Sequence, residues 1–150
     1  MNDVWRPNVT VAAIIEEDGR FLLVEEETPE GIRFNQPAGH LDEGESVVSA
    51  MVRETLEETA YAVEPLHLVG IYRWRRDGAS PTYLRFAFAA RVTGHDPAQP
   101  LDVGILRAVW HSYADIAGTK ARHRSPLVLA CVDDFRAGRR YPLELLRDFA

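Results

Sequence analysis

The sequence predicts a layered domain of the α/β or α+β class, because β-rich runs bracket segments that have helical spacing. With 150 residues and 46% hydrophobic content, the chain can form one sizeable core, and we expect a single domain over residues 1–150. A third observation is a helical pattern between residues 46 and 59 that is apolar on one side and acidic on the other. That pattern also gives the best indication of function.

The first two strands are expected at residues 9–15 and 21–26. Asp18 and Gly19 lie between them, and an Asp-Gly pair between β-rich runs predicts a hairpin that joins the two strands. Residues 27–34 are expected to form a loop.

A second hairpin is expected from strands at residues 66–76 and 82–92, with a turn at residues 77–81. In the second strand, aromatic and aliphatic residues alternate with others, and Arg85 falls on the face opposite the aromatic stripe. This alternation predicts that Arg85 lies against a sheet interior or a cleft.

The remaining elements are a strand at residues 106–111 and helices at residues 125–137 and 143–149. Ser46 is expected to cap the acidic helix, which ends near Thr59.

Composition excludes several classes of protein. The net charge of −6 argues against binding to nucleic-acid polymers or anionic membranes, because both require Lys and Arg to neutralise phosphates. No apolar run approaches the roughly 20 residues of a membrane span, and the start of the chain lacks signal-peptide features, so we expect a cytoplasmic protein. Cys131 stands among apolar residues, which predicts a buried structural thiol.

On the acidic helix, Glu54, Glu57 and Glu58 fall within roughly 100° of one another. Like charges at this spacing destabilise a helix by about 0.2–0.5 kcal/mol per pair, so something must offset the repulsion. A divalent cation such as Mg²⁺ or Mn²⁺ would do so, since hard ions take oxygen ligands and pair with phosphate substrates.

The same segment resembles the Nudix box, G-x5-E-x7-R-E-U-x-E-E-x-G-U, in which U is aliphatic. The six matching positions are Gly39, Glu45, Arg53, Glu54, Glu57 and Glu58. Thr55 replaces an aliphatic residue, and its hydroxyl is expected to bond to a carbonyl of the preceding turn. Ala60 replaces the last glycine, so either the chain leaves the helix differently or a left-handed alanine adds roughly 1 kcal/mol of strain.

The resemblance implies an α/β/α sandwich around a mixed sheet, and hydrolysis of a substrate that contains a nucleoside diphosphate, with Mg²⁺ or Mn²⁺. It implies Glu54 and Glu58 as principal metal ligands, with the carbonyl of Ala38 completing the inner shell. Glu57 would be either a further ligand or the base that takes the proton of the attacking water.

Three further roles follow from the resemblance. Arg53 would orient Glu57, its i,i+4 neighbour. Glu45 would reach the metal through water or stabilise the loop, and Gly39 would permit the close approach of strand to loop. The general base is either a box glutamate or an acid from a distant loop, for which Asp102 is the best candidate; a merely solvated Asp102 is the alternative.

Outside the box, residues 35–40, 84–86, 124–127 and 140–144 resemble the NudJ-type subgroup of small bacterial phosphatases. The subgroup implies phosphate release from nucleoside tri- and diphosphates and from hydroxymethylpyrimidine pyrophosphate, a thiamine precursor. A pyrophosphatase of ADP-ribose or nucleotide sugars is the alternative enzyme. A non-catalytic Nudix-fold module that senses a nucleotide is the alternative from another class.

Candidate substrate contacts each have a structural alternative. Arg85 would bind phosphate or pair with a surface acid, and Gln36 would contact a base edge or only close its loop. Trp74 and Tyr83 would stack on the substrate or pack against the sheet. The expected partner is a small phosphorylated molecule, and the protein would be a monomer or a homodimer.

Overall fold

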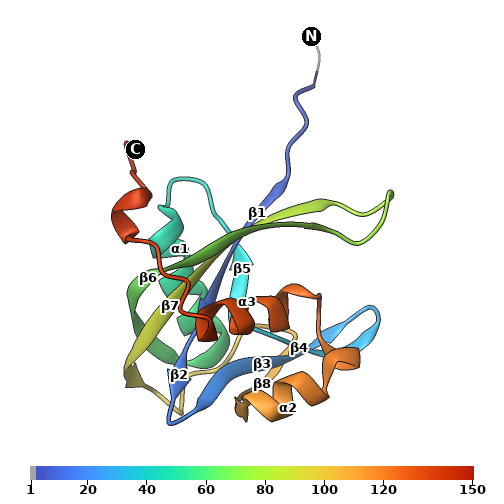
Figure 1. Ribbon diagram of the computed structural model, residues 1–150, viewed down its shortest axis with the longest axis vertical. Coiled ribbons are helices and arrows are strands. Elements are labelled where there is room, and N and C mark those ends of the chain that lie inside the picture. Colours follow the sequence, from blue (N-terminus) through green and yellow to red (C-terminus); the bar gives the residue numbers. More distant parts are fainter. Residues whose placement is uncertain (1–2) are drawn as a thin grey trace.

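The computed structural model describes residues 3–150 and arranges them as two four-stranded sheets with helices around them (Figure 1). The elements in chain order are β1 (Asn8–Ile14), β2 (Glu16–Glu17), β3 (Arg20–Thr28), β4 (Gly31–Asn35), β5 (Ala38–His40), α1 (Val47–Thr59), β6 (Tyr61–Arg75), β7 (Thr82–His95), β8 (Ile105–Ser112), α2 (Tyr113–Gly118), η1 (Lys120–Arg122), α3 (Leu127–Arg136) and η2 (Leu143–Leu145). Both η elements are 3₁₀ helices.

The first sheet has the order β5-β1-β7-β6 and is mixed, because β1 runs parallel to β7 and antiparallel to β5. Helix α1 packs with Val11 and Phe88 on one face of this sheet, and α3 packs with Ile14 and Ala87 on the other. In Figure 1, α3 lies in front of the sheet and α1 behind it. The expected layering, helices on both sides of a mixed sheet, is confirmed.

The predicted hairpin between the first two long strands is wrong. The Asp18-Gly19 turn forms, with positive φ at both residues, but it pairs β3 only with the two-residue strand β2. Strand β1 belongs to the first sheet, and β3 to the second, where it pairs with β2, β4 and β8. Both edges of β1 are occupied by β5 and β7, so no edge remains for β3.

The second predicted hairpin is confirmed, since β6 and β7 pair antiparallel along most of their length and project from the body of the protein (Figure 1). The predicted strand at 106–111 and the helix at 125–137 correspond to β8 and α3. The predicted helix at 143–149 is only the 3₁₀ turn η2, and the predicted loop at 27–34 contains the end of β3 and most of β4. Strand β5 and helix α2 were not expected.

Helix α1 begins and ends where the sequence predicts. Ser46 caps it by accepting the backbone N–H of Ser49 at 3.1 Å, and Thr55 donates its hydroxyl to the Met51 carbonyl at 2.8 Å. Ala60 adopts the left-handed conformation with φ 62°, so the chain keeps the geometry that glycine favours and carries the strain of a β-carbon there. Within residues 3–150, no helix has the length and apolar character required to cross a bilayer.

Candidate active site on the acidic helix

Helix α1 presents its acids at the first sheet's β5 edge because its other face is anchored in the core. Ala50 and Met51 are buried in the cluster that joins α1 to the sheet. The acidic face is thereby turned toward β5, the short strand at the edge of the sheet. Gly39 lies on this strand directly against the Glu54 carboxylate, where a side chain would have no room.

Arg53 donates hydrogen bonds to three glutamates of the acidic segment. It forms a two-pronged contact with Glu45, in which Nε donates to Oε2 at 3.0 Å and Nη2 donates to Oε1 at 2.7 Å. Its Nη1 donates to Glu54 at 2.9 Å and to Glu57 at 3.1 Å, and Nη2 also donates to the His40 carbonyl at 3.1 Å. The hydrogen bonds from Arg53 hold the pKa of Glu45 below its ordinary value. One guanidinium therefore fixes the loop before the helix and two box glutamates together.

Asp102 joins this cluster from a loop far away in the sequence. Oxygen atoms of Glu54, Glu57 and Asp102 lie within 4.8 Å of one another, and the Asp102 N–H donates to the Glu57 carbonyl at 3.1 Å. Burial raises the pKa of Glu54, the hydrogen bond from Arg53 opposes this effect, and the charges of Glu57 and Asp102 reinforce it. Three hard oxygen donors at this separation fit a divalent cation that prefers oxygen ligands.

Glu58 is not one of these three acids, but it lines the same cavity as Glu54 and faces β5. Only 9% of its surface is exposed, and its Oε1 accepts the backbone N–H of Ala38 at 2.9 Å. Burial raises the pKa of Glu58 to about 8, although the Ala38 hydrogen bond acts in the opposite sense. The Ala13 N–H donates to the Pro37 carbonyl, and the Leu41 N–H donates to the Val9 carbonyl, so alternate residues of this segment bond to β1. Ala38 lies between the bonded positions, and its N–H and carbonyl therefore face away from β1, toward the helix side.

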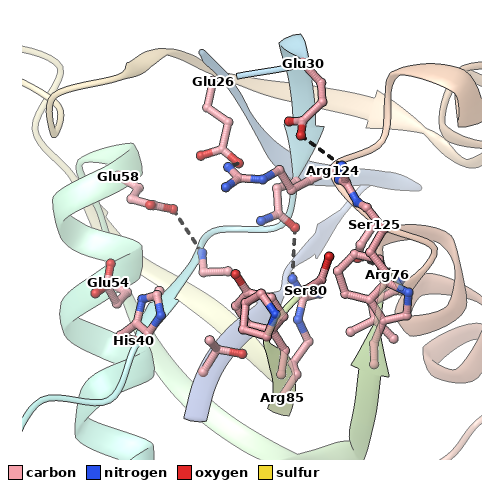
Figure 2. Close-up of a pocket in the computed structure, with 18 of the residues that line it drawn as sticks. Glu26, Glu30, His40, Glu54, Glu58, Arg76, Ser80, Arg85, Arg124 and Ser125 are labelled. Atoms are coloured by element: carbon pink, nitrogen blue, oxygen red, sulfur yellow. Dashed lines mark hydrogen bonds and ion pairs between the residues drawn. The ribbon is translucent and has the colours of Figure 1, made fainter. Parts of the chain in front are cut away.

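A cavity of about 530 Å³ extends from these acids across the end of the sheet. Glu54 and Glu58 enter it from α1, while Arg76 and Arg124 enter from the opposite side, as Figure 2 shows. Both arginines are paired with acids of the second sheet's β3–β4 hairpin: Arg76 with Glu30 at 2.9 Å and Arg124 with Glu26 at 2.7 Å. The cavity therefore has the α1 acids at one end and two arginine–glutamate pairs at the other.

The expected substrate contacts separate into two groups. Arg85, Trp74 and Tyr83 line the cavity, and the two aromatic rings stack with centroids 6.0 Å apart. Gln36 does not line it: its side chain is 1% exposed, and its amide groups are occupied by Arg85 and the Val128 carbonyl. Gln36 therefore lies behind the cavity wall, and its bonds reach β7 and α3, which neither of the two expected roles describes.

Asp102 was expected as a distant candidate and lies beside the box acids, outside the cavity lining. Several cavity residues were missed, namely Thr10, Glu26, Glu30, Asn35, Arg76, Ser80 and Ser125. They come from different strands and loops, and only the pairing of β1 with β7 and the placement of β4 bring them together. No spacing in the sequence could have indicated this set.

Comparison with known proteins agrees with this geometry. The model of the NUDIX domain matches residues 4–130. The chain is 38% identical over 146 residues to phosphatase NudJ of Escherichia coli K12, covering 97% of this chain and 94% of the relative. It superimposes on a NUDIX hydrolase from Nitrosomonas europaea with a TM-score of 0.92 and 51% identity, covering 96% of this chain and 98% of that one.

A more distant structure shares the fold alone. An ADP-ribose pyrophosphatase from Streptococcus suis superimposes with a TM-score of 0.66 at 23% identity, covering 89% of this chain and 93% of that one. The family model spans most of the chain, and the NudJ similarity extends over nearly all of it. The chain therefore belongs to the Nudix family of hydrolases, which act on phosphoric anhydride bonds.

Proposed function

We propose that this hydrolase is a metal-dependent phosphatase that releases phosphate from nucleoside tri- and diphosphates and from hydroxymethylpyrimidine pyrophosphate. One observation carries the proposal: the box acids Glu54 and Glu58 line one end of a cavity that is also lined by Trp74, Tyr83 and Arg85. The similarity to phosphatase NudJ over 97% of the chain supports the choice of substrate class.

The metal would be Mg²⁺ or Mn²⁺, held by Glu54, Glu57, Glu58 and the carbonyl of Ala38. Bound there, it would supply positive charge to the phosphate oxygens near the scissile bond. The chain's own residues prepare the site: Arg53 holds Glu54 and Glu57 in place, and Gly39 leaves space for the Glu54 carboxylate. The Glu58 hydrogen bond to Ala38 fixes the strand that carries the carbonyl ligand.

The residue that takes the proton from the attacking water is Glu57 or Asp102. Both carboxylates lie in the same cluster, and both reach solvent, which a base that receives water requires. Separate replacements by Asn or Gln distinguish the roles. Loss of a base lowers kcat without changing the metal concentration needed for half activity, whereas loss of a ligand raises that concentration.

The nucleobase or pyrimidine would stack on Trp74 or Tyr83, which form one wall of the cavity. The phosphates would then extend toward the acids of α1. Arg85, which lines the cavity without a carboxylate partner, would contribute positive potential to a substrate that the acidic chain would otherwise repel.

The deciding experiment measures phosphate and nucleotide products from nucleoside di- and triphosphates, ADP-ribose and hydroxymethylpyrimidine pyrophosphate, with and without Mg²⁺. We expect Mg²⁺-dependent phosphate release that falls by at least about a hundredfold in Glu58→Gln. Glu144→Gln, the same change at an exposed site on η2, is the control and should retain activity.

The two alternatives give other results. An ADP-ribose or nucleotide-sugar pyrophosphatase would form two monophosphates in place of inorganic phosphate. A nucleotide-sensing module would bind a substrate of the panel and turn over none of them, and Glu58→Gln would then leave all product measurements unchanged.

A further inference from the structure

Arg85 carries a charge that no acid balances among the described residues. It is 5% exposed, and its recorded hydrogen bonds are to Asn35, Gln36 and Cys131, none of which is a carboxylate. Buried arginines are rare unless they are paired, because removing the guanidinium from water is costly. Arg85 is thus a buried cation without a carboxylate partner that lines a cavity, which is the arrangement that favours binding of an anion.

Other arginines around the site behave differently. Arg53 contacts Glu45, Glu54 and Glu57, while Arg122 and Arg124 pair with Glu25 and Glu26. Exposed arginines such as Arg73 and Arg75 also form no ion pair with a described residue, but Arg85 is buried. Arg85 instead has two amide oxygens as its main acceptors, so its orientation is fixed while its charge is kept.

The two amides hold the guanidinium from adjacent positions in the chain. Gln36 Oε1 accepts from Nη1 at 2.9 Å, and Asn35 Oδ1 accepts from Nη2 at 3.0 Å. Gln36 is itself fixed, because its Nε2 donates to the Val128 carbonyl of α3 at 2.7 Å. Asn35 lies at the cavity surface and Gln36 behind it, so the pair forms an amide clamp that turns Arg85 toward the cavity.

The strand register relates Arg85 to the acidic end. Arg85 pairs with Thr10 of β1, and Thr10 pairs in turn with His40 of β5. Two strand spacings separate the backbones of Arg85 and His40, which is about 10 Å. Arg85 lines the same cavity as His40 and the α1 acids Glu54 and Glu58, so one extended polyphosphate could contact both ends.

We propose that Asn35 and Gln36 are positioning residues that hold Arg85 as an uncompensated anion receptor for a phosphate group of the substrate. This inference rests on the proposed function, because it assigns a phosphate subsite within the same cavity. The inference also explains why positions 35 and 36 carry amides. Amides orient the guanidinium and leave its charge, whereas carboxylates at these positions would neutralise that charge.

The test exploits that difference. Replacing Arg85 outright would leave the buried Gln36 oxygen unpaired and risks the fold. Asn35→Asp has the same shape, keeps the acceptor for Nη2, and adds the negative charge that the clamp avoids. Ser125→Asp is the matched control, since Ser125 also lines the cavity but has no recorded hydrogen bond to Arg85.

We expect Asn35→Asp to raise KM for a nucleoside diphosphate by about tenfold, with a smaller change in kcat and an unchanged or higher Tm. Ser125→Asp adds the same charge to the cavity without pairing with Arg85, so it should raise KM by no more than about threefold. Equal increases of KM in the two variants would overturn the inference, because they would show only repulsion by a carboxylate in the cavity. A decrease in kcat with an unchanged KM would also overturn the inference, because it would mean that Asn35→Asp acts on the catalytic acids of α1 and not on phosphate binding.

A binding measurement separates this inference from the proposed function. Inorganic pyrophosphate is titrated into the metal-free protein and followed by ³¹P NMR or calorimetry. Binding that weakens about tenfold in Asn35→Asp supports the anion site even if no substrate is turned over. Absence of pyrophosphate binding to the unaltered protein, or equal binding by the variant, rejects the anion site even if turnover is found.

Discussion

The carboxylate of Glu54 occupies the space that a β-carbon on Gly39 would fill. A β-carbon built on Gly39 would lie 2.1 Å from Cδ of Glu54 and 2.3 and 2.4 Å from its two oxygens. Glycine is needed at this position for close approach, since its φ is not in the left-handed region. The box glycine and the box glutamate are thus directly complementary, although they are fifteen positions apart in the sequence.

Gly39→Ala should displace the Glu54 carboxylate from the cluster that it forms with Glu57 and Asp102. We expect Mn²⁺ affinity and kcat to fall by about 10- to 100-fold, as for other losses of ligand geometry. Calorimetric titration with Mn²⁺ and steady-state assays measure both quantities. Gly118→Ala is the control, because a β-carbon there meets nothing within 4 Å. Equal Mn²⁺ affinity in the two variants would contradict the assignment of Glu54.

Arg53→Lys should preserve the charge and lose the geometry. A lysine cannot reproduce the two-pronged contact with Glu45 while also donating to Glu54 and Glu57. We expect kcat to fall by about 10- to 100-fold because the acids lose their common support. Arg91→Lys, at the exposed pair with Glu64, is the control and should retain full activity. Activity of Arg53→Lys within about twofold of the unaltered protein would show that charge alone suffices.

The buried Glu58 predicts a pH dependence of stability in the absence of metal. Its pKa is about 8 in the folded protein, compared with an ordinary value of 4.5. Between these values the folded protein retains a proton that the unfolded chain has released, so stability falls as the pH rises from about 4.5 to about 8. The contribution of this group is of the order of 1 kcal/mol per pH unit.

Urea unfolding with a chelator present, between about pH 5 and pH 8, measures this effect against Glu58→Gln. The variant has no carboxyl group to ionise there, so its stability should fall less steeply and exceed that of the unaltered protein at the upper end. Saturating Mn²⁺ should flatten the slope of the unaltered protein, because a bound cation stabilises the ionised form. Parallel pH profiles without metal would show that Glu58 ionises normally.

The limits of helix α1 could be predicted because its signals are local. The Ser46 cap, the apolar face and the Thr55 back-bond all depend on residues within four positions of one another. The spacing of the box acids likewise fixed their common face. The β1–β3 hairpin failed for the opposite reason: its turn is local and forms, but the strands that occupy each edge come from distant parts of the chain.

The cavity shows the same distinction. Arg85 could be assigned to an inward face from strand alternation, and it is buried there. Its acceptors could not be predicted, because Asn35 and Gln36 reach it only through the placement of β4 against the first sheet. Asp102 similarly joins Glu57 through a backbone contact between a loop and the end of α1. Long-range contacts of this kind depend on the assembled fold.

Ala60→Gly should relieve strain at the end of α1. Ala60 has φ 62°. Its N–H donates to the Leu56 carbonyl and its carbonyl accepts the Asp96 N–H at 3.1 Å, so hydrogen bonds hold the left-handed conformation at both backbone groups. Glycine removes the steric conflict, which is worth roughly 1 kcal/mol, but it also increases the entropy of the unfolded chain. We expect a net gain of up to about 1 kcal/mol in the free energy of unfolding, measured by urea denaturation.

Ala137→Gly is the matched control, because Ala137 ends α3 with φ −74°, where glycine relieves nothing and should reduce stability. Ala60 is 3% exposed, so its methyl group also contributes packing that glycine would lose. Destabilisation by Ala60→Gly would mean that this packing outweighs the backbone strain. Stabilisation would mean that alanine here retains strain that a glycine in the box would avoid, while the conformation needed to carry the chain from the acidic helix into β6 is preserved in either case.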